Sequence, residues 1–366
     1  MNERCVAVLG WRDEPTDAVE EYCQYLSGAL TAHGMQLELI RVPWPEMGWR
    51  RAVQDLREKT RDSRNTWFFL QYTALGWSRR GFPLRVLRVI RALKKNGGRC
   101  AVVFHDSGPY LGNRLVDRLR RAIQLHTMRK GMHLADLTIL TVPRNKISWI
   151  PKDLRNVTFI PVGANLPCPE GAWQLEKKHD IEIPTVAVFS ISSGAVGREE
   201  VRRIAEAMRY ASREMGPLRL KVLGRNSEIG GKQLREELAG SRVEVVIHGL
   251  LGAEAVVRTL GASDVLLFAR GPICTQRGSA IAGIACGLPV VACEGWETAR
   301  PITEAGVVLL KEDSANEFGP ALVRVLTDSA YQASLRERSR QAQQQYFSWA
   351  VIAAEYASAL RKTGEN

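Results

Sequence analysis

Short apolar segments alternate with amphipathic segments along almost the whole chain, and no other feature restricts the fold as strongly. The apolar segments have the length of buried strands and lie at residues 5–11, 37–42, 67–72, 100–106, 137–142, 157–162, 185–191, 218–224, 243–249, 264–269, 288–293 and 306–310. Segments with apolar side chains at helical spacing separate them, at about 17–33, 50–61, 83–95, 113–130, 197–215, 231–239, 253–261, 279–286 and 314–327. Strands that alternate with helices favour parallel, doubly wound sheets, so the predicted fold class is α/β.

The length of 366 residues exceeds what one hydrophobic core usually supports, which predicts two domains. A segment at 163–184 that contains several prolines separates the first six strands from the last six and is the predicted linker. We predict a Rossmann-like domain over 1–165, a second over 166–345, and a helical segment, 346–366, that returns to the first domain. Two such domains are expected to enclose a cleft.

Three features concern the compartment in which the chain works. No run of 18 apolar residues is present, so a membrane-spanning helix is not expected. The first residues lack the basic, apolar and small-residue order of a signal peptide. The seven cysteines are scattered, odd in number and form no CxxC pair, which favours thiols in a reducing cytosol over disulfides or a zinc site. We therefore expect a cytoplasmic protein with no metal.

The net charge of +12 is concentrated in one stretch of the first half. Residues 79–130 hold 14 Lys and Arg against 2 Asp and Glu, so this stretch alone accounts for the imbalance. Such a stretch favours an anionic partner, which is a lipid surface, a phosphate-bearing substrate or nucleic acid. No nucleic-acid-binding motif is present and aromatic residues are not interleaved with the basic ones, so no nucleic-acid partner is expected.

Within this stretch, Arg79 and Arg80 occupy a glycine-containing loop after the strand at 67–72. Loops at the ends of such strands often bind ligands. The next helix places its basic residues on one face, at Arg85, Arg88, Arg91 and Lys95. The helix that follows repeats the pattern at Arg114, Arg118 and Arg121. A solvated basic surface is the alternative to a binding surface in each case.

Residues 277–292, RGSAIAGIACGLPVVA, predict a turn, a short helix and a buried strand. A helix start after a strand offers free amides and a positive dipole end to a diphosphate. The amides in question are those of Gly278, Ser279 and Ala280. Arg270 and Arg277 flank the turn, and arginine pairs with phosphate bidentately. An ordinary βαβ turn is the alternative.

Three segments together resemble one family. AIAGIACGLPVVA (280–292) is similar to a family helix followed by A-x-G-x-P-V-V-A, VTFIPVGANL (157–166) to its v-i-P-n-G-v strand, and AVVFHD (101–106) to its strand that ends in His-Asp. With these motifs the chain resembles, over nearly its whole length, the retaining GT-B glycosyltransferases of the large bacterial group 1 type. The resemblance implies two Rossmann-like domains with a cleft between them.

The resemblance also implies an activity and its residues. A sugar would pass, with retention of configuration and without a metal or other cofactor, from a nucleotide-diphosphate sugar on the second domain to an acceptor on the first. His105 and Asp106 would lie beside the reacting sugar, and Arg79 and Arg80 near the acceptor. The implied donor contacts are Arg198, Arg225, Arg270, Arg277, Gly278, Ser279, Ala280 and Glu297.

The chain departs from the family at its pair of glutamates, Glu-x(7)-Glu. Cys274 and Ala282 stand at or beside those positions, and Glu297 could partly substitute. Two hypotheses follow. The first is a glycosyltransferase that uses a lipid-linked or other glycan acceptor in cell-surface polysaccharide or glycolipid synthesis, with its basic stretch on the anionic inner face of the cell membrane. The second is a non-catalytic GT-B-like partner or scaffold protein.

Overall fold

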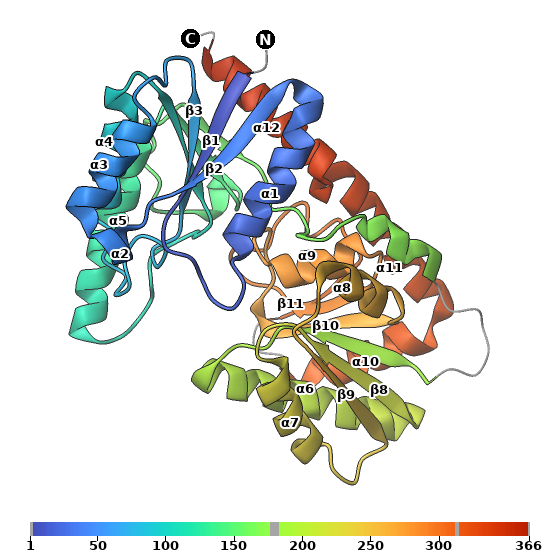
Figure 1. The fold of residues 1–366 in the computed structure, drawn as a ribbon. Helices are drawn as coiled ribbons and strands as arrows, with labels where there is room; N and C mark the ends of the chain where they lie inside the picture. Colours follow the sequence, from blue (N-terminus) through green and yellow to red (C-terminus); the bar gives the residue numbers. More distant parts are fainter. Residues whose placement is uncertain (1–2, 176–182, 312–314, 365–366) are drawn as a thin grey trace. The chain divides into compact units, whose positions relative to one another are not determined.

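The computed structural model describes residues 3–175, 183–311 and 315–364 and divides the chain into two units. Unit 1 comprises Met1–Val162 together with Trp349–Asn366, and unit 2 is the continuous segment Gly163–Ser348. Each unit contains a six-stranded sheet whose paired strands are parallel, with helices on both faces (Figure 1). The predicted pair of Rossmann-like α/β sheets is confirmed.

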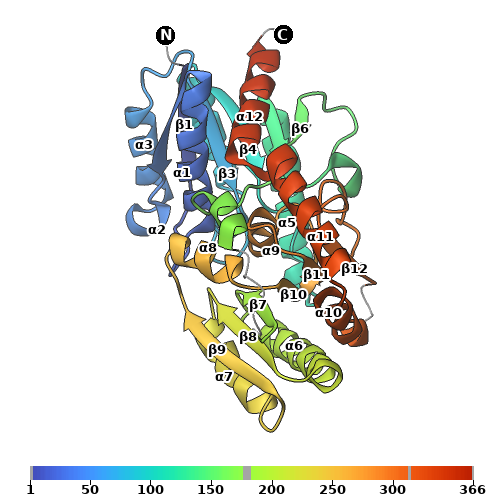
Figure 2. The same ribbon diagram turned by 90° about the vertical axis from the view of Figure 1, so that its right-hand side faces the viewer.

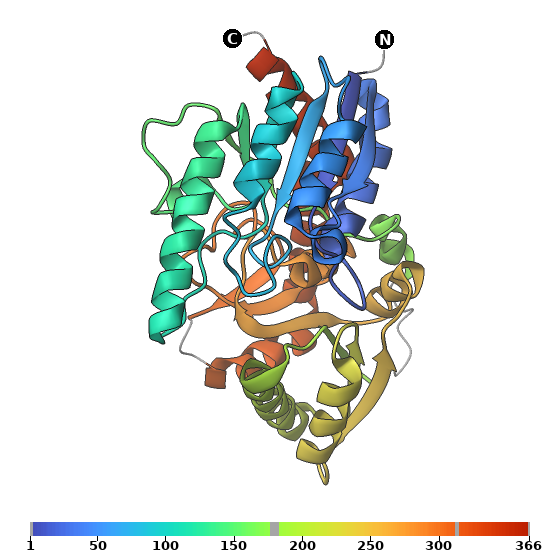
Figure 3. The ribbon, with the colours of Figure 1, turned by 60° about the vertical axis from the view of Figure 1, so that its left-hand side comes forward.

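The sheet of unit 1 has the strand order β2-β1-β3-β4-β5-β6. Its strands are β1 (Glu3–Leu9), β2 (Met35–Arg41), β3 (Trp67–Tyr72), β4 (Arg99–Phe104), β5 (Leu137–Leu140) and β6 (Val157–Phe159). Helices α3 (Trp49–Lys59), α4 (Val86–Lys95) and α5 (Leu115–Leu134) cover one face, and α1 (Ala18–Leu30) and α12 (Trp349–Gly364) cover the other (Figures 1 and 3). The short α2 (Trp44–Met47) precedes α3. Because both faces are covered, every residue of the central strand β3 is buried.

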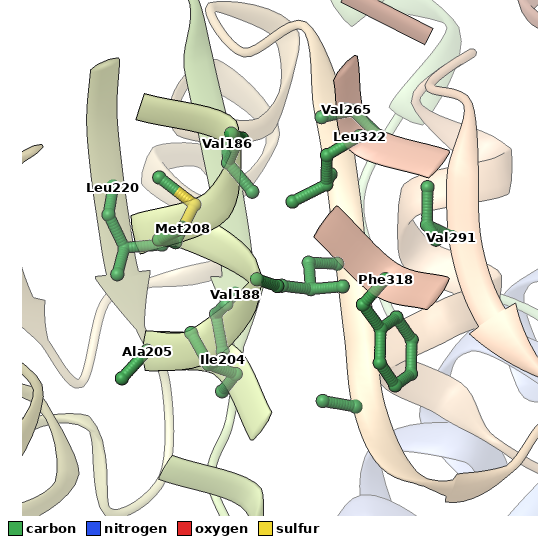
Figure 4. Packing of buried hydrophobic residues seen from close by; sticks show 14 of the residues in the cluster. Val186, Val188, Ile204, Ala205, Met208, Leu220, Val265, Val291, Phe318 and Leu322 are labelled. Atoms are coloured by element: carbon green, nitrogen blue, oxygen red, sulfur yellow. The ribbon is translucent and has the colours of Figure 1, made fainter. Parts of the chain in front are cut away.

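The sheet of unit 2 has the strand order β12-β11-β10-β7-β8-β9. Its strands are β7 (Thr185–Phe189), β8 (Leu218–Leu223), β9 (Val243–Gly249), β10 (Val265–Pro272), β11 (Val290–Cys293) and β12 (Val307–Leu310). Its helices are α6 (Gly194–Met215), α7 (Ser227–Glu237), α8 (Ala253–Gly261), α9 (Gly278–Ala285), α10 (Phe318–Thr327) and α11 (Ser329–Ala342). Branched apolar residues of β7, β8, β10 and β11 pack against α6 and α10 to form the core (Figure 4).

The strand order reverses once in each sheet. In unit 1 the chain moves outward from β1 to β2 and then returns to β3 on the other side of β1. In unit 2 it moves from β7 through β8 to β9 and then returns to β10 on the other side of β7. At such a switch point the two loops leave the sheet toward opposite faces, which opens a crevice at the carboxyl ends of the strands.

Two segments differ from the sequence prediction. The tail at 330–361, which the sequence predicts to be helical, consists of two helices, α11 and α12, separated by a π-helical turn at Gln343–Phe347 and by Ser348. In the predicted linker, Pro169–Leu175 forms a 3-10 helix whose Trp173 indole donates a hydrogen bond to the Ala285 carbonyl (2.9 Å). Residues 176–182 of that linker lie outside the described ranges.

Candidate functional site

A pocket of about 470 Å³ occupies the switch point of unit 1. Its walls are the segment 9–14 after β1, the start of α1 at 17–19, several residues between 71 and 79 on and after β3, and Asp106 after β4. The lining holds four carboxylates and three arginines together with the partly exposed indole of Trp11. Such a mixture suits a polar, hydroxyl-rich ligand, because carboxylates accept and guanidinium groups donate hydrogen bonds.

Asp106 is held in this pocket by the backbone. Its Oδ2 accepts a hydrogen bond from the Ala74 amide at 2.6 Å, which fixes the carboxyl group between the ends of β3 and β4. Burial raises the pKa of Asp106 to about 6, and the Ala74 amide opposes that rise only in part. A carboxyl group with this pKa can change its protonation state near physiological pH.

His105 directly follows β4 and precedes Asp106, and its amide donates to the Tyr72 carbonyl at 3.0 Å. Its Nε2 lies 2.7 Å from Oε1 of Gln71, whose own amide nitrogen donates to the Phe69 carbonyl. Because that second bond orients the amide, Gln71 presents an acceptor, and His105 carries its proton on Nε2. Burial lowers the pKa of His105 to about 4, so the imidazole is neutral at pH 7.

The C-terminal helix α12 contacts Tyr22, and Tyr22 in turn packs against His105. The ring of Tyr22 on α1 stands edge-on to His105, with centroids 5.2 Å apart. The Tyr22 hydroxyl lies 2.9 Å from the Tyr356 hydroxyl of α12, and the Tyr22 ring also packs edge-on to Trp349 at 5.1 Å. Figure 2 shows α12 alongside the other elements of unit 1. The two tyrosines thus connect the last helix of the chain to His105.

The two arginines predicted near an acceptor have different surroundings. Arg79 lines the pocket, and its guanidinium lies over the Trp11 ring, 4.7 Å from the centroid. Arg80 is exposed and is not among the lining residues, and its carbonyl accepts a hydrogen bond from Arg120. Of this pair, the structure therefore places only Arg79 with Asp106.

His105 and Asp106 change the free energy of unfolding with pH in opposite directions, because their pKa shifts have opposite signs. The folded chain keeps a proton on Asp106 up to about pH 6, whereas the unfolded chain loses it near 3.8, so this group lowers stability as pH rises between those values. His105 holds its proton only to about pH 4 when folded, against 6.5 when unfolded, so it raises stability over nearly the same interval. The two slopes oppose each other in the wild-type chain.

Single substitutions are expected to reveal each slope. Asp106→Asn keeps the acceptor for the Ala74 amide, and the free energy of unfolding should then rise with pH between about 4 and 6.5. His105→Gln should make it fall over that interval, with neither slope above about 1.4 kcal/mol per pH unit. Urea denaturation at half-unit steps of pH measures both. Profiles parallel to the wild type in both variants would contradict these pKa shifts.

Positively charged side chains gather around one buried glutamate at the switch point of unit 2. Glu200, in the second turn of α6, is buried and accepts a hydrogen bond from the Ser192 amide at 2.8 Å. This contact requires Gly197, because a Cβ there would lie 1.9 Å from the Ser192 carbonyl oxygen. Burial raises the pKa of Glu200, while the nearby charge of Arg270 acts in the other direction. Glu200 thereby offsets one positive charge at the end of β10.

Two further arginines, Arg225 and Arg277, act on Arg270 at this switch point. Burial lowers the pKa of Arg270, and the charges of Arg277 and Arg225 lower it further, which shows that the three arginines lie within electrostatic range of one another. Arg270 donates to the Ser279 hydroxyl at 3.3 Å, in the first turn of α9. Within the described part of the chain, the buried Nε of Arg277 has no hydrogen-bond partner. We call Arg225, Arg270 and Arg277 the arginine cluster.

The other residues that the resemblance implies as donor contacts differ in their exposure and in their neighbours. Gly278 is exposed, Ser279 is half-buried and Ala280 is buried, so the first turn of α9 leads from the surface inward. The Cys274 thiol donates to the Glu297 carboxylate and lies near Arg277, and burial raises its pKa. Arg198 is exposed in the first turns of α6. The structure thus groups Glu297 with Arg277 through Cys274.

Over residues 3–175, 183–311 and 315–364, no group of three or more His, Cys, Asp or Glu side chains is arranged to hold a metal ion.

Sequence analysis missed three residues of these sites. Gln71 is a lone polar residue inside the apolar strand WFFLQY, and a buried polar residue in a central strand needs a partner, which was an available signal. Glu200 falls at helical spacing with the buried Val201 and Ile204, where a charge is unusual. Trp11 carried no signal, because its contact with Arg79 joins two loops that are distant in sequence.

Comparison with known proteins shows a likeness of structure alone. No family model and no curated protein matches the chain. The sucrose-phosphate synthase of Thermosynechococcus elongatus matches with 20% identity and a TM-score of 0.69, covering 99% of each chain. A glycosyltransferase of Rickettsia africae matches with 13% identity and a TM-score of 0.67, covering 100% of this chain and 99% of that one. Anabaena HepE, solved with UDP and glucose, matches with 14% identity and a TM-score of 0.63, covering 98% and 100%. The two units have the GT-B fold.

Proposed function

We propose that this chain is a glycosyltransferase. It transfers a sugar from a nucleotide-diphosphate sugar bound by unit 2 to an acceptor bound by unit 1, with retention of configuration. The observation that carries the proposal is the arginine cluster at the switch point of unit 2, with one buried guanidinium nitrogen that has no hydrogen-bond partner in the described chain. Loss of the sugar leaves negative charge on the diphosphate, and fixed cations stabilise that charge as it develops.

Two further features support a nucleotide-diphosphate donor. Gly278, Ser279 and Ala280 begin α9, where the helix dipole favours an anion, and Arg270 is bonded to the same turn. The amides of Gly278 and Ala280 already donate to the Gln276 and Arg277 carbonyls, so the predicted cradle of three free amides is not present and the dipole and the arginines remain as the attraction. The structure of Anabaena HepE was solved with UDP and glucose. Glu297, hydrogen-bonded to Cys274, is proposed as the carboxylate that contacts the donor sugar or ribose in place of the family's glutamate pair.

The pocket of unit 1 is the proposed acceptor site. Asp106 would accept a hydrogen bond from an acceptor hydroxyl, and its backbone contact with Ala74 keeps it in place. The neutral His105 is not among the lining residues, but its Nε2 lies 2.7 Å from Oε1 of Gln71, which does line the pocket, and we place His105 beside the reacting sugar through this contact. Arg79 over Trp11 would contact the same acceptor. In this assignment no step requires a metal.

The proposed acceptor is a glycan, lipid-linked or otherwise, used in cell-surface polysaccharide or glycolipid synthesis. The proposed location is the cytoplasm, with peripheral attachment to the inner face of the cell membrane. The excess of basic residues over 79–130 supports attachment to an anionic surface. Among the residues that the structure describes, no helix has the length and apolar character needed to cross a membrane.

Arg277→Ala is the direct test of the donor site. The substitution should weaken binding of UDP by about 1.5–3 kcal/mol, the range for hydrogen bonds to a charged group. The unliganded variant should be at least as stable as the wild type, because Arg277 leaves Nε unsatisfied and its charge opposes that of Arg270. Titration calorimetry with UDP and with a panel of nucleotide sugars measures the first effect, and urea denaturation measures the second.

Arg258→Ala is a matched control, because Arg258 is an exposed arginine of the same unit on α8. It should leave UDP affinity unchanged. Equal affinity in the wild type and in Arg277→Ala would remove Arg277 from the donor site. Tight nucleotide-sugar binding without turnover against any glycan acceptor would favour the non-catalytic alternative.

A further inference from the structure

The first turns of α5 and the loop before them expose an unusual number of large apolar side chains. Tyr110 is 55% exposed, Leu111 74%, Leu115 80%, Val116 46% and Leu119 57%. In contrast, the apolar residues of the neighbouring helix α4 are buried. A helix on a sheet normally turns its apolar face to the core, so apolar side chains on the outer surface of α5 need another explanation.

These apolar residues are surrounded by positive charge. Arg114, Arg118 and Arg121 are exposed on the same turns of α5. The only acid between residues 107 and 135 is Asp117, which is buried and is bonded to the Arg114 amide and to the Arg120 guanidinium. We call the exposed apolar residues at 110, 111, 115, 116 and 119, with these three arginines, the α5 surface.

The fold holds the α5 surface rigidly. Gln124 of α5 accepts a hydrogen bond from the Tyr110 amide at 2.7 Å and donates to the Gly81 carbonyl at 2.9 Å. Arg120 lies over the rings of Tyr110 and Phe82. Figures 1 and 3 show the N-terminal turns of α5 extending past the ends of α3 and α4. The surface is therefore a projecting, ordered helix end and not a groove.

We propose that the α5 surface inserts into the headgroup region of an anionic lipid bilayer. Leucine and valine side chains on a projecting helix end enter the acyl boundary, while the flanking arginines meet lipid phosphates. Arg85, which precedes α4, and Arg88 and Arg91 on α4 adjoin the exposed Leu84 but no cluster of exposed apolar residues like that of α5, so they contribute attraction at a distance. The proposal rests on the proposed function only through the lipid-linked acceptor, which would be presented at such a surface.

The test is co-sedimentation with vesicles of phosphatidylcholine alone and of phosphatidylcholine with phosphatidylglycerol, at low and at high salt. The wild type should bind the anionic vesicles and retain part of this binding in high salt, because the apolar contribution is not screened. Leu111→Ser with Leu115→Ser should lower the partition coefficient at least tenfold at both salt concentrations. Ile229→Ser with Leu250→Ser, at similarly exposed positions of unit 2, is the matched control and should bind as the wild type does.

Charge variants complete the experiment. Removing Arg114, Arg118 and Arg121 should lower low-salt binding by about fivefold per residue near the bilayer. Removing Arg85, Arg88 and Arg91 should have a smaller effect that disappears in high salt. Equal binding by the leucine variant and the wild type would overturn the proposal. The proposal would also be overturned if analytical ultracentrifugation showed a wild-type dimer that becomes a monomer in the leucine variant, with no lipid binding by either protein.

The outcome is independent of the donor site. UDP affinity is measured on the same preparations, and the leucine variant should retain it because the α5 surface lies in unit 1. If the wild type binds UDP but no vesicles, the α5 surface and the proposed membrane attachment are rejected, and the proposed sugar transfer stands. Vesicle binding without any nucleotide or nucleotide-sugar binding would reject the proposed function and leave the α5 surface standing.

Discussion

His105→Ala is expected to lower kcat by about 10²- to 10⁴-fold, the usual contribution of a positioned acid–base group at a reacting centre. The imidazole is neutral, its Nε2 proton is directed to Gln71 at 2.7 Å, and Tyr22 fixes the ring edge-on. Alanine removes the imidazole and its hydrogen bond to Gln71, which lines the pocket. Turnover is measured with a nucleotide-sugar donor and a glycan acceptor, and UDP affinity is measured in parallel.

The comparison needs a check on folding, because His105 lies at the end of a buried strand. His126→Ala, on the exposed side of α5, serves as the matched histidine control and should retain wild-type turnover. In His105→Ala the far-ultraviolet circular dichroism and the UDP affinity should remain unchanged while kcat falls. If kcat stays at the wild-type value, His105 has no catalytic role.

Phe318→Ala is expected to destabilise unit 2 by about 3–5 kcal/mol. Phe318 begins α10, is fully buried, and belongs to the core formed by β7, β10, β11 and α6 (Figure 4). Removing its ring leaves a cavity that close-packed neighbours fill only in part. Hydrogen exchange of backbone amides, followed by mass spectrometry, assigns the loss to one unit or the other.

The expected exchange pattern is specific. Amides of α6, β7 and β10 should lose protection in Phe318→Ala, whereas amides of β1, β3 and β4 in unit 1 should not. Ile229→Ala changes an exposed apolar residue of unit 2 and should alter stability by no more than about 0.5 kcal/mol. Equal loss of protection in both units would show that they unfold as one cooperative body.

The repeating pattern of apolar segments predicted the fold well because period and length determine how strands and helices can be buried. Even so, the helical tail predicted over 330–361 is interrupted at Gln343–Phe347, and no glycine or proline marks the break. The Trp173 contact with Ala285 could not be predicted either, because it joins residues that are far apart in sequence.

The candidate sites were predictable in part for the same reason. Arg270 and Arg277 flank a recognisable turn, and His105 and Asp106 end a recognisable strand. Their partners come from other elements of the fold: Gln71 from β3 and Glu200 from α6. Strand order decides which loops meet, and order across a sheet leaves no mark on the local sequence. The pocket lined by Trp11 could therefore not be predicted, because it depends on β1 and β3 being neighbours in the sheet.

Unit 1 is formed by two separate segments of the chain, and this delays its completion during synthesis. Unit 2 is one unbroken segment, whereas unit 1 needs its last helix, α12, which leaves the ribosome after all of unit 2. Until then Tyr22 lacks the Tyr356 hydroxyl, and the face of the first sheet that α12 covers remains open to water. The nascent first half therefore stays incomplete while some 190 further residues are translated, a period of roughly ten to forty seconds at 5–20 residues per second. A chaperone bound to the nascent chain would find this open face first.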